Sequence, residues 1–296
     1  MAVEEKTWTI IEMIRWGTEY LGSRGFDEAR LNMELLLSAA LGMKRFDLYV
    51  KHDQPLKKSE LDILRPLLKR RLAHEPIQYI LGSTNFYSIE LKVDSRALIP
   101  RPETEILADT VISHCKSLQA GGDKVRVLDI GTGSGCIAIA IAKFVPDSEV
   151  TAIDSSRDAL GLAGENASGS GTSERIVFRE LDFLNVKADS FDKEFDVIVS
   201  NPPYVSVSEF KTLDEQIKNY EPVKAVSDNG DGFTFFRKIA SMARSLLKNG
   251  GMVFVETSYG QSGKVCEIFS EHGGRDLIVK KDLSNIDRVV GARFFK

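Results

Sequence analysis

The spacing of hydrophobic residues changes along the chain and predicts two parts of different architecture. In the N-terminal part, apolar residues fall at helical spacing between Asp27 and Leu41, and Gly42 favours a helix end there. An earlier segment carries a similar apolar face at Ile10 and Ile14. We therefore expect a small bundle of short helices in this part of the chain.

A third helical segment is expected over residues 59–73. Ser59 is a suitable N-cap, because Asp62 follows it three residues later. Pro66 lies inside this segment and lacks a backbone N–H, so it predicts a kink or two short pieces. The N-terminal helices show no chemical motif.

The pattern changes after Pro76. Residues 77–93 contain β-favouring stretches that predict a hairpin or an extended link. Two prolines, Pro100 and Pro102, then fix the backbone before a helix that should begin near Thr104.

From Lys124 onward, apolar runs typical of buried strands alternate with helical patterns. We expect helices from Cys136, near Asp158 and over 235–248, and a surface loop in the Gly/Ser-rich stretch 167–173. The expected strands are VRVLDIG, EVTAID, RIVFRELD, FDVIVS, GMVFVET, DLIVKKDL and RVVGARFFK. Such alternation predicts a mostly parallel sheet with helices on both faces.

Composition narrows the possible functions. The 296 residues can form one large and one small domain, and the net charge of -4 lacks the basic character of proteins that wrap nucleic acid. Three scattered cysteines and four histidines form no metal-binding pattern. The N-terminus MAVEEKTWTI is acidic where a signal peptide would be basic, and no apolar run could span a bilayer. We therefore expect a soluble cytoplasmic protein without a metal ion.

A glycine-rich turn follows the first expected strand of the second part. It reads Asp129-Ile130-Gly131-Thr132-Gly133-Ser134-Gly135, and glycines there bring backbone N–H groups close to a ligand at a helix N-terminus. The dinucleotide fingerprint requires a third glycine where Cys136 stands, which disfavours NAD. Asp129 would repel a pyrophosphate but suits a ligand with an ammonium and a sulfonium group.

Further acidic residues follow the next two strands. Asp154 can accept hydrogen bonds from two ribose hydroxyls, and Asp182-Phe183 lies where an adenine ring could stack. Ligands of open α/β sheets bind at this carboxyl edge. Cys136 is expected to be a packing residue and not a reactive thiol.

The motif Asn201-Pro202-Pro203-Tyr204 follows the fourth strand at the same edge. An amide nitrogen is planar and poorly nucleophilic, so two acceptors that each take one N–H would orient it and favour positive charge on nitrogen. The Asn201 side-chain oxygen and the Pro202 carbonyl can be these acceptors, and the prolines fix the backbone. Tyr204 is expected to form a flat wall beside the planar group.

Together these motifs resemble the class I methyltransferases of exocyclic and amide nitrogens. The segment EPIQYILGSTNFYSIELKVDSRALIPRPETE narrows the resemblance to the HemK/PrmC-type peptide chain release factor glutamine methyltransferases. Residues 220–222, 231–233, 281–283 and 288–290 are also similar to that family. The chain departs from it at Glu256-Thr257, where an Ile-Gly pair is more common after the acid, and at Phe183, where some members carry tryptophan.

The resemblance implies an N-terminal helical domain that docks the release factor (1–82), a β-hairpin linker (83–98) and a catalytic domain (99–296). The catalytic fold would be a Rossmann-like seven-stranded sheet, mostly parallel with one antiparallel strand. A monomeric enzyme would transfer a methyl group from S-adenosylmethionine to the glutamine N5 of the Gly-Gly-Gln motif in class I release factors, leaving S-adenosylhomocysteine. Residues 201–204 would hold this glutamine. The expected cofactor contacts are Asp129, Gly131, Thr132, Gly133, Ser134, Gly135, Asp154, Asp182, Phe183 and Asn201.

Two alternatives remain open. An adenine N6 methyltransferase of DNA or RNA faces the same geometric problem, but it must bind a phosphate backbone, which the net charge of -4 disfavours. A cofactor-binding module without activity would not need the motif at 201–204.

Overall fold

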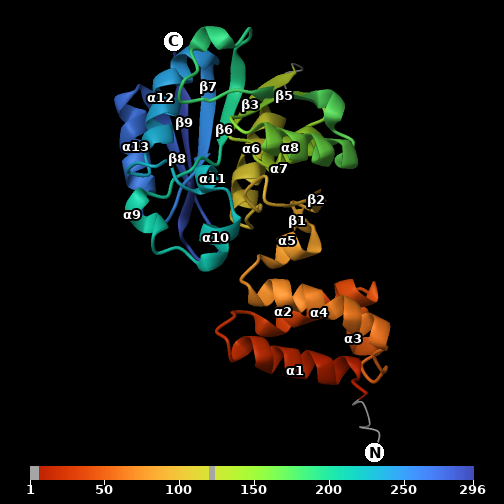
Figure 1. The fold of residues 1–296 in the computed structure, drawn as a ribbon. Helices are drawn as coiled ribbons and strands as arrows, with labels where there is room; N and C mark the ends of the chain where they lie inside the picture. The colour runs from red at the N-terminus through yellow and green to blue at the C-terminus, as the bar shows by residue number, and fades with distance from the viewer. Residues whose placement is uncertain (1–6, 120–123) are drawn as a thin grey trace, which may run out of the picture. The chain divides into compact units, whose positions relative to one another are not determined.

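The computed structural model describes residues 7–119 and 124–296 (Figure 1). The chain divides into two compact units, Met1–Gly82 and Ser83–Lys296. The first six residues, which begin the acidic N-terminus used above to argue against a signal peptide, lie outside the described residues. No helix in the described part of the chain is both long and apolar enough to cross a membrane.

The first unit is a helical bundle with its own hydrophobic core. The core is built from one face of each long helix and includes Ile10, Leu36 and Leu64. As expected, Gly42 ends the second helix in a left-handed conformation, with φ of 62°. The helices are α1 (Ile10–Gly22), α2 (Ala29–Leu41), α3 (Arg45–Val50), α4 (Lys58–Leu72) and α5 (Ile77–Leu81).

Helix α4 corrects two expectations. Its N-cap is Lys57 and not Ser59, because the Glu60 carboxylate accepts a hydrogen bond from the Lys57 N–H at 2.7 Å. It also continues through Pro66 as one helix. Pro66 and Asp62, whose carbonyl loses its helical partner there, are both exposed. Water can bond to that carbonyl, so the proline does not end the helix.

A β-hairpin opens the second unit. Strands β1 (Ser83–Phe86) and β2 (Ile89–Lys92) pair antiparallel. The expected extended region therefore begins later than residue 77, since α5 occupies its first residues. The hairpin is not an isolated link, because Phe86 and Leu91 are buried in the hydrophobic core of the second unit.

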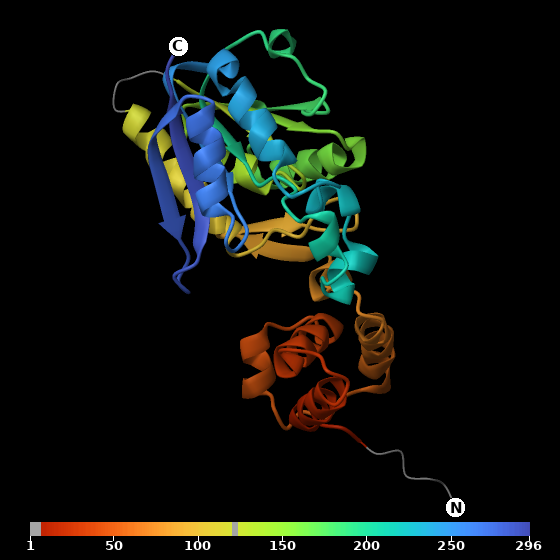
Figure 2. The ribbon, with the colours of Figure 1, turned by 90° about the vertical axis from the view of Figure 1, so that its left-hand side faces the viewer.

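The second unit is built on a seven-stranded sheet in the order β5-β4-β3-β6-β7-β9-β8 (Figures 1 and 2). Strand β9 runs antiparallel to both of its neighbours, while β3 to β7 pair in parallel. The mostly parallel sheet with one antiparallel strand confirms the expected fold class. The strands are β3 (Val125–Ile130), β4 (Ser148–Asp154), β5 (Ile176–Glu180), β6 (Phe195–Ser200), β7 (Leu247–Glu256), β8 (Gly274–Lys281) and β9 (Asp287–Phe294).

Helices cover both faces of this sheet. One hydrophobic core joins the sheet to α6 (Thr104–Gln119), α7 (Cys136–Phe144), Ala167 of α8 (Arg157–Ser170) and the hairpin. A second core lies against α12 (Thr234–Leu246) and α13 (Ser262–Glu271), which lie together on the other face in Figure 2. The short helices are α9 (Val207–Phe210), α10 (Glu215–Tyr220), α11 (Val223–Val226) and the 3₁₀ turns η1 (Ser173–Arg175) and η2 (Ala188–Ser190).

Some expected boundaries were wrong. The Gly/Ser-rich stretch 167–173 is not simply a loop, because α8 extends to Ser170 and buries Ala167. Lys248 belongs to β7 and not to the preceding helix. The short helices and α13 were not foreseen.

Candidate active site

The glycine-rich turn connects β3 to α7. Gly131, Gly133 and Gly135 all have positive φ (73°, 54° and 82°), which a residue with a side chain rarely adopts. The N–H groups of Gly131 and Thr132 bond to the Ile153 carbonyl at 2.9 and 3.0 Å. The end of β4 therefore fixes the shape of the turn.

Asp154 ends β4 beside this turn. One carboxylate oxygen accepts from the Gly133 N–H and the other from the Ser156 N–H, each at 2.9 Å. Burial raises the pKa of Asp154, while these backbone hydrogen bonds oppose the increase. Each oxygen has further acceptor capacity, which suits it to hydroxyl groups of a ligand.

Asp129 lies beneath the turn and is fully buried. Burial raises its pKa to about 7, and the hydrogen bond from the Thr132 hydroxyl (2.7 Å to Oδ2) opposes this. Its other oxygen, Oδ1, has no hydrogen-bond partner among the described residues. Asp129 thus acts on the turn through Thr132.

Asn201 follows β6 at the same edge. The Ser200 hydroxyl bonds to the Ile130 carbonyl at 2.7 Å, which ties the end of β6 to the end of β3. The Asn201 Nδ2 group donates to the hydroxyl of Thr104 at 3.1 Å. Its side-chain oxygen accepts no hydrogen bond from the residues that the structure describes.

The end of the motif is held from the opposite side. The Tyr204 hydroxyl donates to Glu256 at 3.2 Å, and the Tyr204 carbonyl accepts from Gln261 at 2.9 Å. Burial raises the pKa of Glu256 to about 7, and hydrogen bonds from Thr104 and Tyr204 oppose this increase. Burial also raises the pKa of Tyr204.

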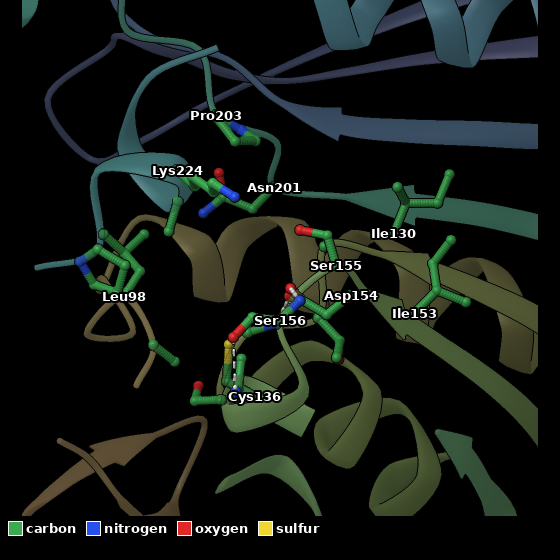
Figure 3. Close-up of a pocket in the computed structure, with 18 of the residues that line it drawn as sticks. Leu98, Ile130, Cys136, Ile153, Asp154, Ser155, Ser156, Asn201, Pro203 and Lys224 are labelled. Atoms are coloured by element: carbon green, nitrogen blue, oxygen red, sulfur yellow. Dashed lines mark hydrogen bonds between the residues drawn. The ribbon is translucent and has the colours of Figure 1, made fainter. Parts of the chain in front are cut away.

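These segments surround a cavity of about 400 Å³ (Figure 3). That volume is typical of small-molecule sites, which span roughly 300–1,000 Å³. In Figure 3, Asp154 and Asn201 come from two different strands of the sheet, and Lys224 of α11 lies close to Asn201. Other wall residues include Ala97, Leu98, Pro100, Ile137, Ala159, Leu181, Pro222 and Phe235.

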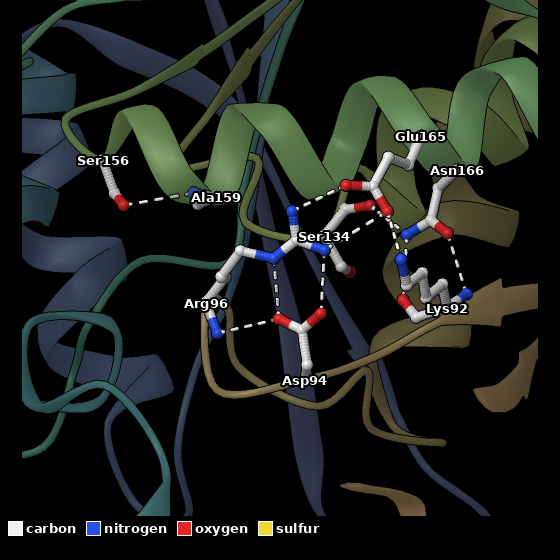
Figure 4. Close-up of polar contacts among 8 residues, drawn as sticks. All are labelled: Lys92, Asp94, Arg96, Ser134, Ser156, Ala159, Glu165 and Asn166. Carbon is white, nitrogen blue, oxygen red and sulfur yellow. Dashed lines mark hydrogen bonds and ion pairs between the residues drawn. The ribbon is translucent and has the colours of Figure 1, made fainter. Parts of the chain in front are cut away.

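A cluster of polar side chains contacts residues of the cavity wall (Figure 4). The guanidinium of Arg96, a wall residue, donates to Asp94 and to Glu165 of α8. The buried Asn166 side chain donates to the carbonyls of Lys92 and Ser134, at 3.0 and 2.9 Å. Helix α8 therefore connects the hairpin to the glycine-rich turn.

The sequence of this chain is similar to those of known proteins. Residues 12–82 match the PrmC N-terminal domain, and residues 122–282 match a methyltransferase domain. A release factor glutamine methyltransferase of Chlorobaculum tepidum is 40% identical over 290 residues, which is 96% of this chain and 97% of that protein. The protein of the same name from Geobacter sulfurreducens is 39% identical over 293 residues, 99% of each chain. This chain belongs to the release factor glutamine methyltransferase family.

The family resemblance drawn from the motifs is thus confirmed. A solved methyltransferase from Pyrococcus furiosus has a similar fold, with a TM-score of 0.50 and 17% identity over 78% of this chain and 97% of that one. At this identity, the likeness concerns the fold alone.

The structure brings most of the expected site residues of this family member together. On the cavity wall are Gly131, Thr132, Gly133, Ser134, Asp154, Asp182, Phe183, Asn201 and Pro203. Asp182 and Phe183 lie beyond the end of β5 and not within it. The Asp182 carboxylate accepts from its own turn, at Leu184 N–H and Asn185 Nδ2.

Four expected site residues lie off the cavity wall: Asp129, Gly135, Pro202 and Tyr204. A Cβ on Gly135 would come within 3.0 Å of the Ala163 Cβ, so this glycine permits close packing of α7 on α8. The partly buried Tyr204 hydroxyl requires a partner and donates to Glu256. Burial raises the pKa of the Cys136 thiol to about 12, which disfavours the reactive thiolate.

Sequence reasoning missed residues that hold the wall from a distance. The buried Glu221 carboxylate bonds to the Ile99 N–H at 3.2 Å and pairs with Arg101. Thr104 was noted only as a helix start. Both belong to segments that resemble the family, which was the only available signal.

Proposed function

We propose that this chain transfers the methyl group of S-adenosylmethionine to the N5 atom of the glutamine in the Gly-Gly-Gln motif of class I peptide chain release factors. One observation carries the proposal: Asn201, whose side-chain oxygen has no partner among the described residues, lines the same cavity as the glycine-rich turn and Asp154. The proposed cofactor site and the proposed amide acceptor thus line one cavity, and the relatives of this chain are named release factor glutamine methyltransferases.

The polar and apolar groups that line the cavity fit S-adenosylmethionine. Asp154 would hold the ribose hydroxyls, Phe183 would pack near the adenine, and the backbone of Gly131 and Gly133 would approach the rest of the ligand. Burial raises the pKa of Asp129 beneath the turn, and a cationic ligand would favour ionisation of this carboxyl where a pyrophosphate would oppose it, so the residue suits the cationic ligand. The bound cofactor supplies an electrophilic methyl group on a sulfonium.

Residues of the chain orient the acceptor amide. Asn201 Oδ1 would accept one N–H of the glutamine and the Pro202 carbonyl would accept the other. Pro202 lies between the wall residues Asn201 and Pro203, and no described residue donates to its carbonyl. Both bonds grow stronger as positive charge develops on nitrogen, which stabilises the transition state. The bound cofactor would supply the methyl group while these two acceptors hold the amide N–H groups in place.

The N-terminal unit is proposed to dock the release factor. Helix α3 exposes Phe46 (76%) and Val50 (62%), and α4 exposes Ile63. We assign the docking surface to these side chains, because surfaces that bind other proteins commonly expose apolar residues. We further propose that the enzyme is a monomer, acts in the cytoplasm where release factors work, and has no nucleic-acid substrate.

Mass spectrometry tests this function. The enzyme is incubated with labelled S-adenosylmethionine and a class I release factor, and the Gly-Gly-Gln peptide is sequenced. We expect one methyl group on the glutamine side chain, and none on a factor whose motif glutamine is replaced by glutamate. DNA and RNA are incubated with the enzyme and labelled cofactor in parallel. Labelled adenine in these samples, together with an unmodified release factor, would overturn the proposal in favour of the adenine N6 methyltransferase.

A further inference from the structure

The two ends of the Asn201 side chain have nearly the same shape and opposite hydrogen-bonding character. The oxygen only accepts, and the NH₂ group only donates. An acceptor amide presents N–H groups to this residue, so only the orientation with Oδ1 toward the cavity is productive. Some contact outside the motif at 201–204 must therefore select the orientation.

Thr104 makes that contact. It is the first residue of α6, it is 1% exposed, and its hydroxyl oxygen accepts from Asn201 Nδ2 at 3.1 Å. The two residues are 97 positions apart, so the contact exists only in the folded chain. With the NH₂ group held by Thr104, Oδ1 is the end left without a partner in the described chain.

Glu256 favours one direction of the Thr104 hydroxyl. Thr104 lowers the pKa of the buried Glu256 carboxyl, which is the effect of an O–H group directed toward a carboxylate. With its hydrogen directed toward Glu256, the hydroxyl presents its lone pairs to Asn201. The reversed amide would place two acceptor oxygens against each other, which is costly in a buried site.

We infer that Thr104 is a positioning residue for methyl transfer, whose hydroxyl takes the Asn201 NH₂ group and so directs Oδ1 to the acceptor amide. This inference rests on the proposed function, because it assigns a role within the same site. Thr104 acts through Asn201 and needs no contact with the reacting atoms.

Four forms of the full-length protein test the inference: wild type, Thr104→Val, Thr104→Ser and Thr110→Val. Valine keeps the shape of threonine but removes the hydroxyl, and serine retains it. Thr110 lies on the same helix and its hydroxyl donates to the Ile106 carbonyl at 2.7 Å, so its variant is the matched control. For each form we would measure kcat and KM with the release factor, and the Kd of S-adenosylmethionine.

Thr104→Val should lower kcat by about 10- to 100-fold, less than loss of a direct contact to the reacting group, and leave the cofactor Kd within about twofold. Thr104→Ser and Thr110→Val should remain close to wild type. Full kcat in Thr104→Val would overturn the inference. So would a loss of kcat that serine does not restore, or one that accompanies an equal loss of cofactor binding.

A second readout does not depend on the acceptor. In ¹⁵N-asparagine-labelled wild-type protein, the Asn201 NH₂ signals (assigned by their loss in Asn201→Asp) should show one hydrogen-bonded proton. That signal should persist in Thr104→Ser and disappear in Thr104→Val. Its absence from the wild type would overturn the inference even if Thr104→Val fails to fold. A wild type that shows this signal but leaves release factors unmodified would refute the proposed function alone.

Discussion

The buried carboxylate of Glu221 is ion-paired with the guanidinium of Arg101, although the two residues are 120 positions apart. Its other oxygen accepts from the Ile99 N–H at 3.2 Å. One side chain between α10 and α11 therefore holds the segment that enters α6 and forms part of the cavity wall.

Glu221→Ala should destabilise the protein and weaken cofactor binding. It leaves the buried Ile99 N–H without an acceptor, which costs about 1–3 kcal/mol, while the partly exposed Arg101 can turn to water. Urea unfolding and cofactor titration measure the two effects. Glu267→Ala removes an exposed glutamate and should be nearly neutral. Wild-type stability and affinity in the Glu221 variant would contradict the role assigned to this carboxylate.

The location of the site could be predicted from sequence because parallel strands end at one edge of the sheet. The glycine-rich turn, Asp154 and Asn201 each lie at the end of a different strand. Once these strands are recognised in the sequence, the three features are expected at the same edge of the sheet. Glu221 and Thr104 could not be assigned this way, since their partners are set by tertiary packing. The hydrogen bond from Tyr204 to Glu256 could not be predicted either, because position along a chain does not give the direction of a side chain.

The cofactor contact assigned to Asp154 predicts a binding defect. Asp154→Ala should raise the Kd of S-adenosylmethionine by about 10- to 100-fold, because it removes the ribose acceptor and frees the Gly133 N–H of the turn. At saturating cofactor, kcat should change little, since these contacts are the same before and during transfer. Calorimetric titration measures this. Asp158→Ala, an exposed acid on α8, is the control, and equal affinity in both variants would refute the assignment.

Asn201→Ala should act mainly on kcat. The lost acceptor matters most as charge develops on the amide nitrogen, so the transition state should lose about 2–4 kcal/mol. Single-turnover rates at saturating cofactor measure the loss. Asn249→Ala, which removes an acceptor for the Lys296 N–H far along the chain, should retain full activity. A fully active Asn201 variant would show that the amide is oriented by other groups.

Glu256 predicts a pH dependence of stability. Its pKa rises from 4.5 to about 7 in the folded protein, so the folded state binds this proton more tightly than the unfolded chain. Its contribution is therefore fully present below about pH 4.5 and is lost as the pH rises to about 7, by at most about 3 kcal/mol.

Glu256→Gln removes this titration while keeping an oxygen for the Tyr204 hydroxyl. Relative to wild type, the variant should therefore gain stability as the pH rises through that window. Urea unfolding at a series of pH values measures the difference. A constant difference between the two proteins from pH 4.5 to 7 would show that the carboxyl titrates normally.

Removal of the N-terminal unit should separate docking from chemistry. One glutamine side chain buries too little surface to select a protein, because specific partners bury about 800 Å² on each side. The additional contact area is assigned here to the helical bundle, whose α3 exposes Phe46 and Val50. The second unit, Ser83–Lys296, has a hydrophobic core on each face of its sheet. Without the first unit, it should still bind S-adenosylmethionine. It should methylate the intact release factor mainly with a raised KM.

If the bundle only stabilises the fold, truncation would instead lower the melting temperature and cofactor affinity together. Full-length Phe46→Ser is the matched variant, because it alters the exposed surface without removing the bundle. Like the truncation, it should raise KM for the release factor, and it should leave cofactor binding unchanged. A truncated protein that is folded, binds cofactor normally and modifies the release factor at the wild-type rate would exclude docking by this unit, since no contact area would then be missing.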